Sequence, residues 1–95
     1  MTEPEAVLGS LGPAAWSEED GRAYEVALDG INQVVGAYSG LIAAAERAGE
    51  ADRVRGLRQE QARWSAKRLD LTPADRQEVD AITAEAAGVL RGLRE

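Results

Sequence analysis

The side chains in this sequence most suited to chemistry are the basic ones gathered between residues 53 and 68. This stretch, RVRGLRQEQARWSAKR, holds six of the eleven Lys and Arg residues of a chain whose formal net charge is −6. Guanidinium and ammonium groups at this density can bind nucleic acid phosphates, hold a small anion or pair with carboxylates. The six basic residues are Arg53, Arg55, Arg58, Arg63, Lys67 and Arg68.

Other kinds of chemistry have little support in the sequence. The 95 residues include neither Cys nor His, which removes thiol chemistry, the commonest metal ligand and the usual general base at neutral pH. No glycine-rich phosphate-binding motif is present. The carboxylates are spread along expected helix surfaces, where solvation is a sufficient explanation for them. We therefore expect no catalytic residue, no cofactor and no metal site, and a protein that is not an enzyme.

The elements that position the basic residues are helices. Ser17 is a suitable N-cap before three acidic residues, and Gly49 is a suitable stop, so the first helix should run to about Ala48. Gly30 leaves open whether this helix is continuous or divided. Apolar residues recur along it with alternating spacings of four and three, which is a heptad pattern. They are Tyr24, Leu28, Ile31, Val35, Tyr38, Ile42 and Ala45.

A strip of small residues on the same helix consists of Gly36, Gly40 and Ala44, spaced by four positions. Each glycine costs roughly 1 kcal/mol relative to Ala inside a helix, so its presence needs a reason. We expect the strip to allow close packing against a neighbouring helix.

Two further helices complete the expected fold. Residues 51–69 form the second, and the short loop AGEA before it requires an antiparallel course. In LDLTP, Thr72 is a suitable N-cap and Pro73 a suitable first residue, so the third helix should run to about Arg94. Its heptad pattern is Val79, Ile82, Ala86, Val89 and Leu93.

The predicted fold is all-α, an antiparallel helical hairpin plus a third helix. Together they would form a three-helix bundle with a long first helix and heptad-like seams. Residues 1–15 are expected to be an N-terminal tail or a short docking helix, and residues 16–95 a single helical-bundle domain.

The basic helix lies between two acidic segments. Residues 1–46 carry a net charge of −7, residues 47–68 of +4 and residues 69–95 of −3. On a helical wheel the basic residues flank the apolar face on both sides, whereas a helix that reads DNA bases would gather them on one solvent face. We therefore favour pairing with acidic residues of the neighbouring helices. An acidic protein partner and nucleic acid are alternatives, and the net charge opposes the second.

The expected helix lengths leave the start of the first helix bare. At 1.5 Å per residue the first helix is roughly 48 Å long and the second roughly 28 Å, so the second reaches back only to about residue 30. The third is expected beside the far half of the first. An exposed apolar patch of this kind usually forms an interface. The predicted interface residues are Val7, Leu8, Leu11, Trp16, Tyr24 and Leu28.

The function expected from these features is a non-catalytic protein–protein interaction module, such as a small adaptor, accessory or regulatory subunit of a larger bacterial assembly. Its partner would be another protein or a second copy of itself, with a homodimer favoured and nucleic acid not expected. One alternative is an antitoxin-like regulator that binds nucleic acid through the basic helix, and another is a small helical enzyme or carrier of an anionic ligand. No stretch has the length of a membrane span and the acidic start lacks the features of a signal peptide, so a cytoplasmic location is expected.

Overall fold

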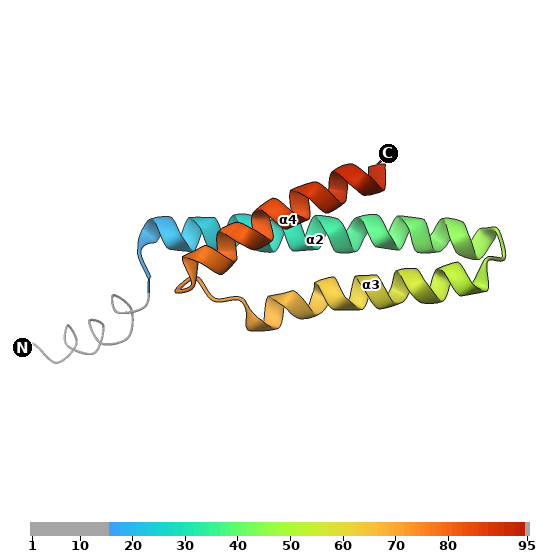
Figure 1. Cartoon of the computed structure of the whole chain (residues 1–95), viewed down its shortest axis with the longest axis horizontal. Helices are drawn as coiled ribbons and strands as arrows, with labels where there is room; N and C mark the ends of the chain where they lie inside the picture. Colours follow the sequence, from blue (N-terminus) through green and yellow to red (C-terminus); the bar gives the residue numbers. More distant parts are fainter. Residues whose placement is uncertain (1–15, 95) are drawn as a thin grey trace, which may run out of the picture.

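Three helices make up residues 16–94, the part of the chain that the computed structural model describes (Figure 1). They are α2 (Glu18–Arg47), α3 (Ala51–Asp70) and α4 (Arg76–Arg94). α3 and α4 each pack along α2, and no strand occurs between residues 16 and 94. The predicted all-α fold with a hairpin, a third helix and a long first helix is confirmed. The expected tail or docking helix of residues 1–15 lies outside the described residues.

α2 begins and ends where its capping residues predict. Ser17 Oγ accepts a hydrogen bond from the backbone N–H of Asp20 at 3.0 Å, and Asp20 Oδ2 accepts one from the backbone N–H of Ser17 at 3.2 Å. These two bonds satisfy donors that a helix start otherwise leaves free. At the other end Gly49 has a φ of +73°, a conformation that glycine adopts without strain. The chain therefore leaves α2 and turns directly into α3.

Gly30 marks a close approach of two helices, and α2 continues through it from Glu18 to Arg47. A Cβ atom at Gly30 would lie 3.1 Å from the Cβ of Ala86 in α4. The absence of a side chain thus allows the backbones of α2 and α4 to come together at this point, and the helix is not divided there.

The core lies on the sides of α2 that face α3 and α4. Trp64 of α3 is its bulkiest member and is only 4% exposed. The heptad pattern predicted Val35 in the core, but Val34 is fully buried and Val35 is half-buried. Val34 follows Gly30 by one turn and faces α4, so the second partner helix widens the buried face. The buried apolar residues are Ala27, Ile31, Val34, Tyr38, Ile42, Ala45, Trp64, Leu71, Val79, Ile82, Ala86 and Leu90.

α4 runs parallel to α2 and starts at the N-terminal end of that helix. Arg76 Nη1 donates to Asp20 Oδ1 at 3.0 Å, and the contact between Gly30 and Ala86 lies ten residues further along both helices. The expectation that the start of the first helix is bare is therefore wrong, since Tyr24 and Leu28 are half-buried against the core. The connection after α3 carries the chain past the end of that helix, so α4 begins at the level of Asp20.

The start of α4 is one turn later than predicted. Thr72 O accepts from the backbone N–H of Asp75 at 3.1 Å and closes a turn that includes Pro73. Asp75 Oδ1 then accepts from the backbone N–H of Glu78 at 3.1 Å, as an N-cap does. Asp75 is therefore the cap, and the first helical residue is Arg76.

α3 and α4 meet through side chains and not through their backbones. No Cα atom of α3 lies within 8 Å of one in α4. Lys67 Nζ lies 5.0 Å from the centroid of the Trp64 ring and 3.8 Å from Glu85 Oε1 of α4. Figure 1 shows α4 crossing α2 obliquely and moving away from α3 toward its C-terminal end. The two shorter helices are thus held in place mainly by α2.

Gly36, Gly40 and Ala44 do not pack against α3 or α4. All three are exposed, and a Cβ atom at either glycine would have no neighbour within 4 Å. Within residues 16–94 the expected close packing of this strip does not occur, because both neighbouring helices lie on the other side of α2.

Replacing Gly30 by Ala should stabilise the fold less than the same change at Gly56. Gly56 lies inside α3 with no atom within 4 Å of an added Cβ, so Gly56→Ala should raise the free energy of unfolding by about 0.5–1 kcal/mol. At Gly30 that gain is offset by crowding against Ala86, and overpacking typically costs about 1–3 kcal/mol. Urea unfolding followed by circular dichroism measures both variants. Equal gains would contradict the close approach of α2 and α4.

Acid should weaken the junction between α2 and α4. The backbone N–H of Ser17 and the guanidinium of Arg76 lower the pKa of Asp20 from its ordinary value of 3.8. The stabilisation from this carboxylate is therefore complete above that value and is lost as the pH falls through the lowered pKa. Asp20→Asn should reduce the free energy of unfolding at neutral pH and should lose less on acidification than the natural chain. Unfolding measured between about pH 7 and about pH 3 tests this, and an equal acid-side loss in both proteins would contradict it.

Candidate functional site

The described part of the chain covers Tyr24 and Leu28 at the N-terminal end of α2, while Trp16 and Val26 stay exposed there. Trp16 is 46% exposed, and its ring lies over Gly21, where a Cβ would be 3.8 Å from Trp16 Cδ1. Tyr24 and Leu28 are half-buried. The other three predicted interface residues, Val7, Leu8 and Leu11, lie outside the described residues. The assignment of these six residues to an interface stays a prediction.

The six basic residues of α3 each have an acceptor close by. Three pair with carboxylates of α3 itself or of the turn before it. These pairs are Arg53 with Glu50 at 3.9 Å, Arg55 with Asp52 at 2.7 Å and Arg63 with Glu60 at 3.0 Å.

The other three basic residues reach neighbouring helices in both directions. Arg58 Nη2 lies 2.7 Å from Glu46 Oε2 of α2, and Lys67 reaches Glu85 of α4. Arg68 Nη1 donates to Asn32 Oδ1 of α2 at 3.0 Å. The basic side chains therefore do not form one exposed face. Two of the six basic residues therefore pair with acids of neighbouring helices, and three pair with acids of α3 or of the turn before it.

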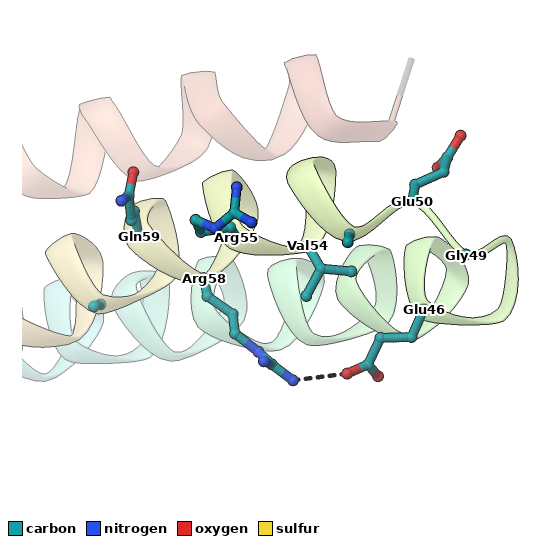
Figure 2. Close-up of a pocket in the computed structure, with 9 residues that line it drawn as sticks. Glu46, Gly49, Glu50, Val54, Arg55, Arg58 and Gln59 are labelled. Carbon is teal, nitrogen blue, oxygen red and sulfur yellow. Dashed lines mark hydrogen bonds and ion pairs between the residues drawn. The ribbon is translucent and has the colours of Figure 1, made fainter.

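An open groove lies at the hairpin end of the molecule, along one flank of α3 (Figure 2). Its volume is about 680 Å³. Residues from the end of α2, the turn and the first three turns of α3 line it. Its apolar lining comes from Ala51, Val54 and Ala62, and Arg55 and Arg58 supply positive charge.

Regular helix spacing brings these groove residues together. Ala51, Arg55, Arg58 and Ala62 are separated by four, three and four positions, so they share one flank of α3. Val54 is half-buried beside them. In Figure 1 the C-terminal end of α4 stops short of the turn between α2 and α3. The hairpin end is thus a layer of two helices that the third does not cover.

The ion pair between Arg58 and Glu46 spans the two helices at this groove (Figure 2). The two side chains are 60% and 51% exposed. Exposed pairs of this kind contribute only about 0–1 kcal/mol to stability. A carboxylate from another molecule can therefore replace Glu46 beside Arg58 at little energetic cost.

The groove combines apolar side chains with charged groups of both signs. None of the nine residues that line it carries a hydroxyl, thiol or imidazole group. Within residues 16–94, no three acidic side chains come together to hold a metal ion. The lining offers contact with apolar side chains, charge-assisted hydrogen bonding from Arg55 and Arg58, and the carboxylates of Glu46 and Glu50.

Sequence reasoning named Arg55 and Arg58 but did not identify the groove. Ala51 and Ala62 were overlooked, although their spacing with the two arginines was a usable signal. The exposure of this flank was not predictable from the spacing alone, because it depends on where α4 ends in space.

Comparisons with known proteins give no assignment. No family model, no curated protein and no solved structure matches this chain. Between residues 16 and 94, none of the helices combines the length and the apolar character needed to cross a membrane.

Replacing Arg58 by Ala should leave the fold almost unchanged. The lost ion pair is exposed, so the free energy of unfolding should change by less than about 1 kcal/mol. Trp64→Ala is the contrasting variant, because emptying a buried Trp site costs about 3–5 kcal/mol. Urea unfolding of both variants provides the test. A loss of more than about 2 kcal/mol for Arg58→Ala would show that its ion pair is structural and not available for exchange.

Proposed function

We propose that this protein is a non-catalytic protein-interaction module that binds its partner through the hairpin groove. It would act as a small adaptor, accessory or regulatory subunit of a larger bacterial assembly in the cytoplasm. The observation that carries this proposal is the combination of an apolar lining with two guanidinium groups on a flank of α3 that α4 leaves open.

The lining residues define the chemistry of the partner. Aliphatic side chains would contact Ala51, Val54 and Ala62, and carboxylates would accept hydrogen bonds from Arg55 and Arg58. Arg is enriched where proteins meet, and truncating a well-placed Arg often costs much of the binding energy. An acidic amphipathic segment of another protein, or of a second copy, satisfies both requirements.

Nucleic acid is a weaker candidate for the same surface. The six basic residues of α3 point to different sides of the helix, so they do not form one row along a phosphate backbone. The net charge of −6 also opposes approach to phosphate groups. No observation favours the alternatives of an enzyme or an anion carrier over protein binding.

Site-specific photocrosslinking in cells that produce the protein tests this proposal. A photoreactive amino acid at Ala62 lies in the groove, and one at Ala84, an exposed position of α4, serves as the matched control. We expect a protein adduct of defined mass from position 62 and none from position 84. Arg58→Glu should abolish the adduct, because it adds a third carboxylate to Glu46 and Glu50 in the groove and repels an acidic partner.

Circular dichroism should show that Arg58→Glu keeps its helical content. Equal adducts at both positions, an adduct that Arg58→Glu leaves unchanged, or an adduct with nucleic acid would contradict the proposal.

A further inference from the structure

Two opposite charges lie at the ends of an uncovered face of α2. Asp29 and Arg47 are both exposed, and neither belongs to an ion pair within the described residues. Asp29 Oδ2 accepts a hydrogen bond from Gln33 Nε2 at 2.7 Å, which leaves its charge uncompensated. The two residues are 18 positions apart, or roughly 27 Å along the helix, and share the same angular position on it.

Between these charges the face carries no charge, and apart from Gln33 its residues are small, with Ala43 half-buried. Its residues have the heptad spacing of four, three, four, three and four, which continues on the side of α2 away from the core. No charged residue occurs in the sequence between Asp29 and Glu46. The members of this face, called here the outer seam, are Asp29, Gln33, Gly36, Gly40, Ala43 and Arg47.

Nothing in the described part of the chain accounts for the two glycines of the outer seam. A Cβ atom at Gly36 or Gly40 would meet no neighbour within 4 Å, in contrast to Gly30, which faces Ala86. Each exposed glycine still costs roughly 1 kcal/mol relative to Ala. A second helix lying on this face would use the missing side chains, because small contact residues allow helix axes to approach to about 8 Å.

We propose that the outer seam binds the outer seam of a second copy, with the two α2 helices antiparallel. Asp29 and Arg47 are each nine positions from position 38. A two-fold axis that meets the outer seam at the level of position 38 therefore sets each Asp29 opposite Arg47 of the second copy. The same axis brings Gly36 and Gly40 of the two copies together at the crossing. A two-fold interface must be self-complementary, and the order of acid, small residues and base along this face meets that condition. A different protein would require no such relation between the two ends, which is why the occupant is a second copy.

The acidic character of the chain opposes this association only weakly. Within residues 29–47 the one other charged residue is Glu46, which pairs with Arg58 away from the outer seam. The remaining acids of α2 lie before Asp29, beyond the segment where the two helices overlap. Repulsion over such distances is largely screened at physiological salt, where the Debye length is about 8 Å. This dimer rests on the proposed role in protein association but does not use the hairpin groove.

Sedimentation velocity over a range of concentrations tests the dimer. The natural chain should show a concentration-dependent dimer, and Gly40→Leu should raise the dissociation constant about tenfold or more by holding the helices apart. Leu favours helix over Gly, and the site has no neighbour to crowd, so this variant should fold at least as stably. Gly56→Leu, at an equally open glycine of α3, is the matched control and should leave the dimer intact.

Charge reversal supplies a second, independent measurement. Asp29→Arg should weaken the dimer through repulsion from Arg47 of the second copy, and so should Arg47→Asp through the facing Asp29. The double variant Asp29→Arg with Arg47→Asp should recover most of the affinity, since the pairs are re-formed with their signs exchanged. A natural chain that stays monomeric at high concentration, or a dimer unaffected by Gly40→Leu, would overturn the proposal. A dimer that is lost only in Arg58→Glu would likewise overturn it, while leaving the groove as the site of association.

Discussion

The contact between Gly30 of α2 and Ala86 of α4 decides which surfaces of this protein are covered. A Cβ at Gly30 would lie 3.1 Å from that of Ala86, a close contact, so the glycine lets the two helices follow this course without crowding. Together with the bond from Arg76 to Asp20, the contact aligns α4 with the N-terminal half of α2. The same alignment leaves the hairpin end without a third helix. Both the groove and the placement of the core therefore follow from one close approach.

The resulting hydrophobic core is narrow, and it is built by packing α3 and α4 against α2. α3 and α4 have no backbone contact with each other, and side chains such as Lys67, near the Trp64 ring and Glu85, connect them. Most of the ion pairs are exposed, so each adds little stability. Their positions still favour one arrangement of the helices, because the basic middle helix meets carboxylates on both of its flanks. The packing of α3 and α4 against α2 supplies the stability of the fold, and the ion pairs help to set which helix lies beside which.

The local features of the fold were predictable from the sequence, whereas the course of α4 was not. Ser17 and Gly49 fix the ends of α2 through short-range hydrogen bonds and backbone conformation, and these effects depend only on neighbouring residues. The start of α4 was predicted one turn early, because Thr72 and Pro73 have the types of a helix start but form a turn that Asp75 completes. The direction of α4 depends on the contact between Gly30 and Ala86, which are 56 positions apart in the sequence. No pattern of neighbouring residues indicates such a contact.

The glycines of α2 show why composition alone was misleading. Gly30, Gly36 and Gly40 have the same helix propensity, yet of these three only Gly30 is explained by packing among the described residues. The sequence suggested that the strip of Gly36 and Gly40 faces a neighbouring helix, and within residues 16–94 it faces none. The positions of α3 and α4 were needed to tell Gly30 from Gly36 and Gly40, because both helices lie on the side of α2 away from Gly36 and Gly40.

Two consecutive residues of α2, Glu46 and Arg47, lie on different exposed surfaces at the hairpin end. Successive helical residues point about 100° apart, so Glu46 faces Arg58 at the groove while Arg47 lies on the outer seam. One molecule on the groove and another on the outer seam would therefore approach α2 from different directions without competing for the same side chains. Under the two proposals, α2 would join a partner to a pair of identical chains, because this helix is packed on two sides and open on a third.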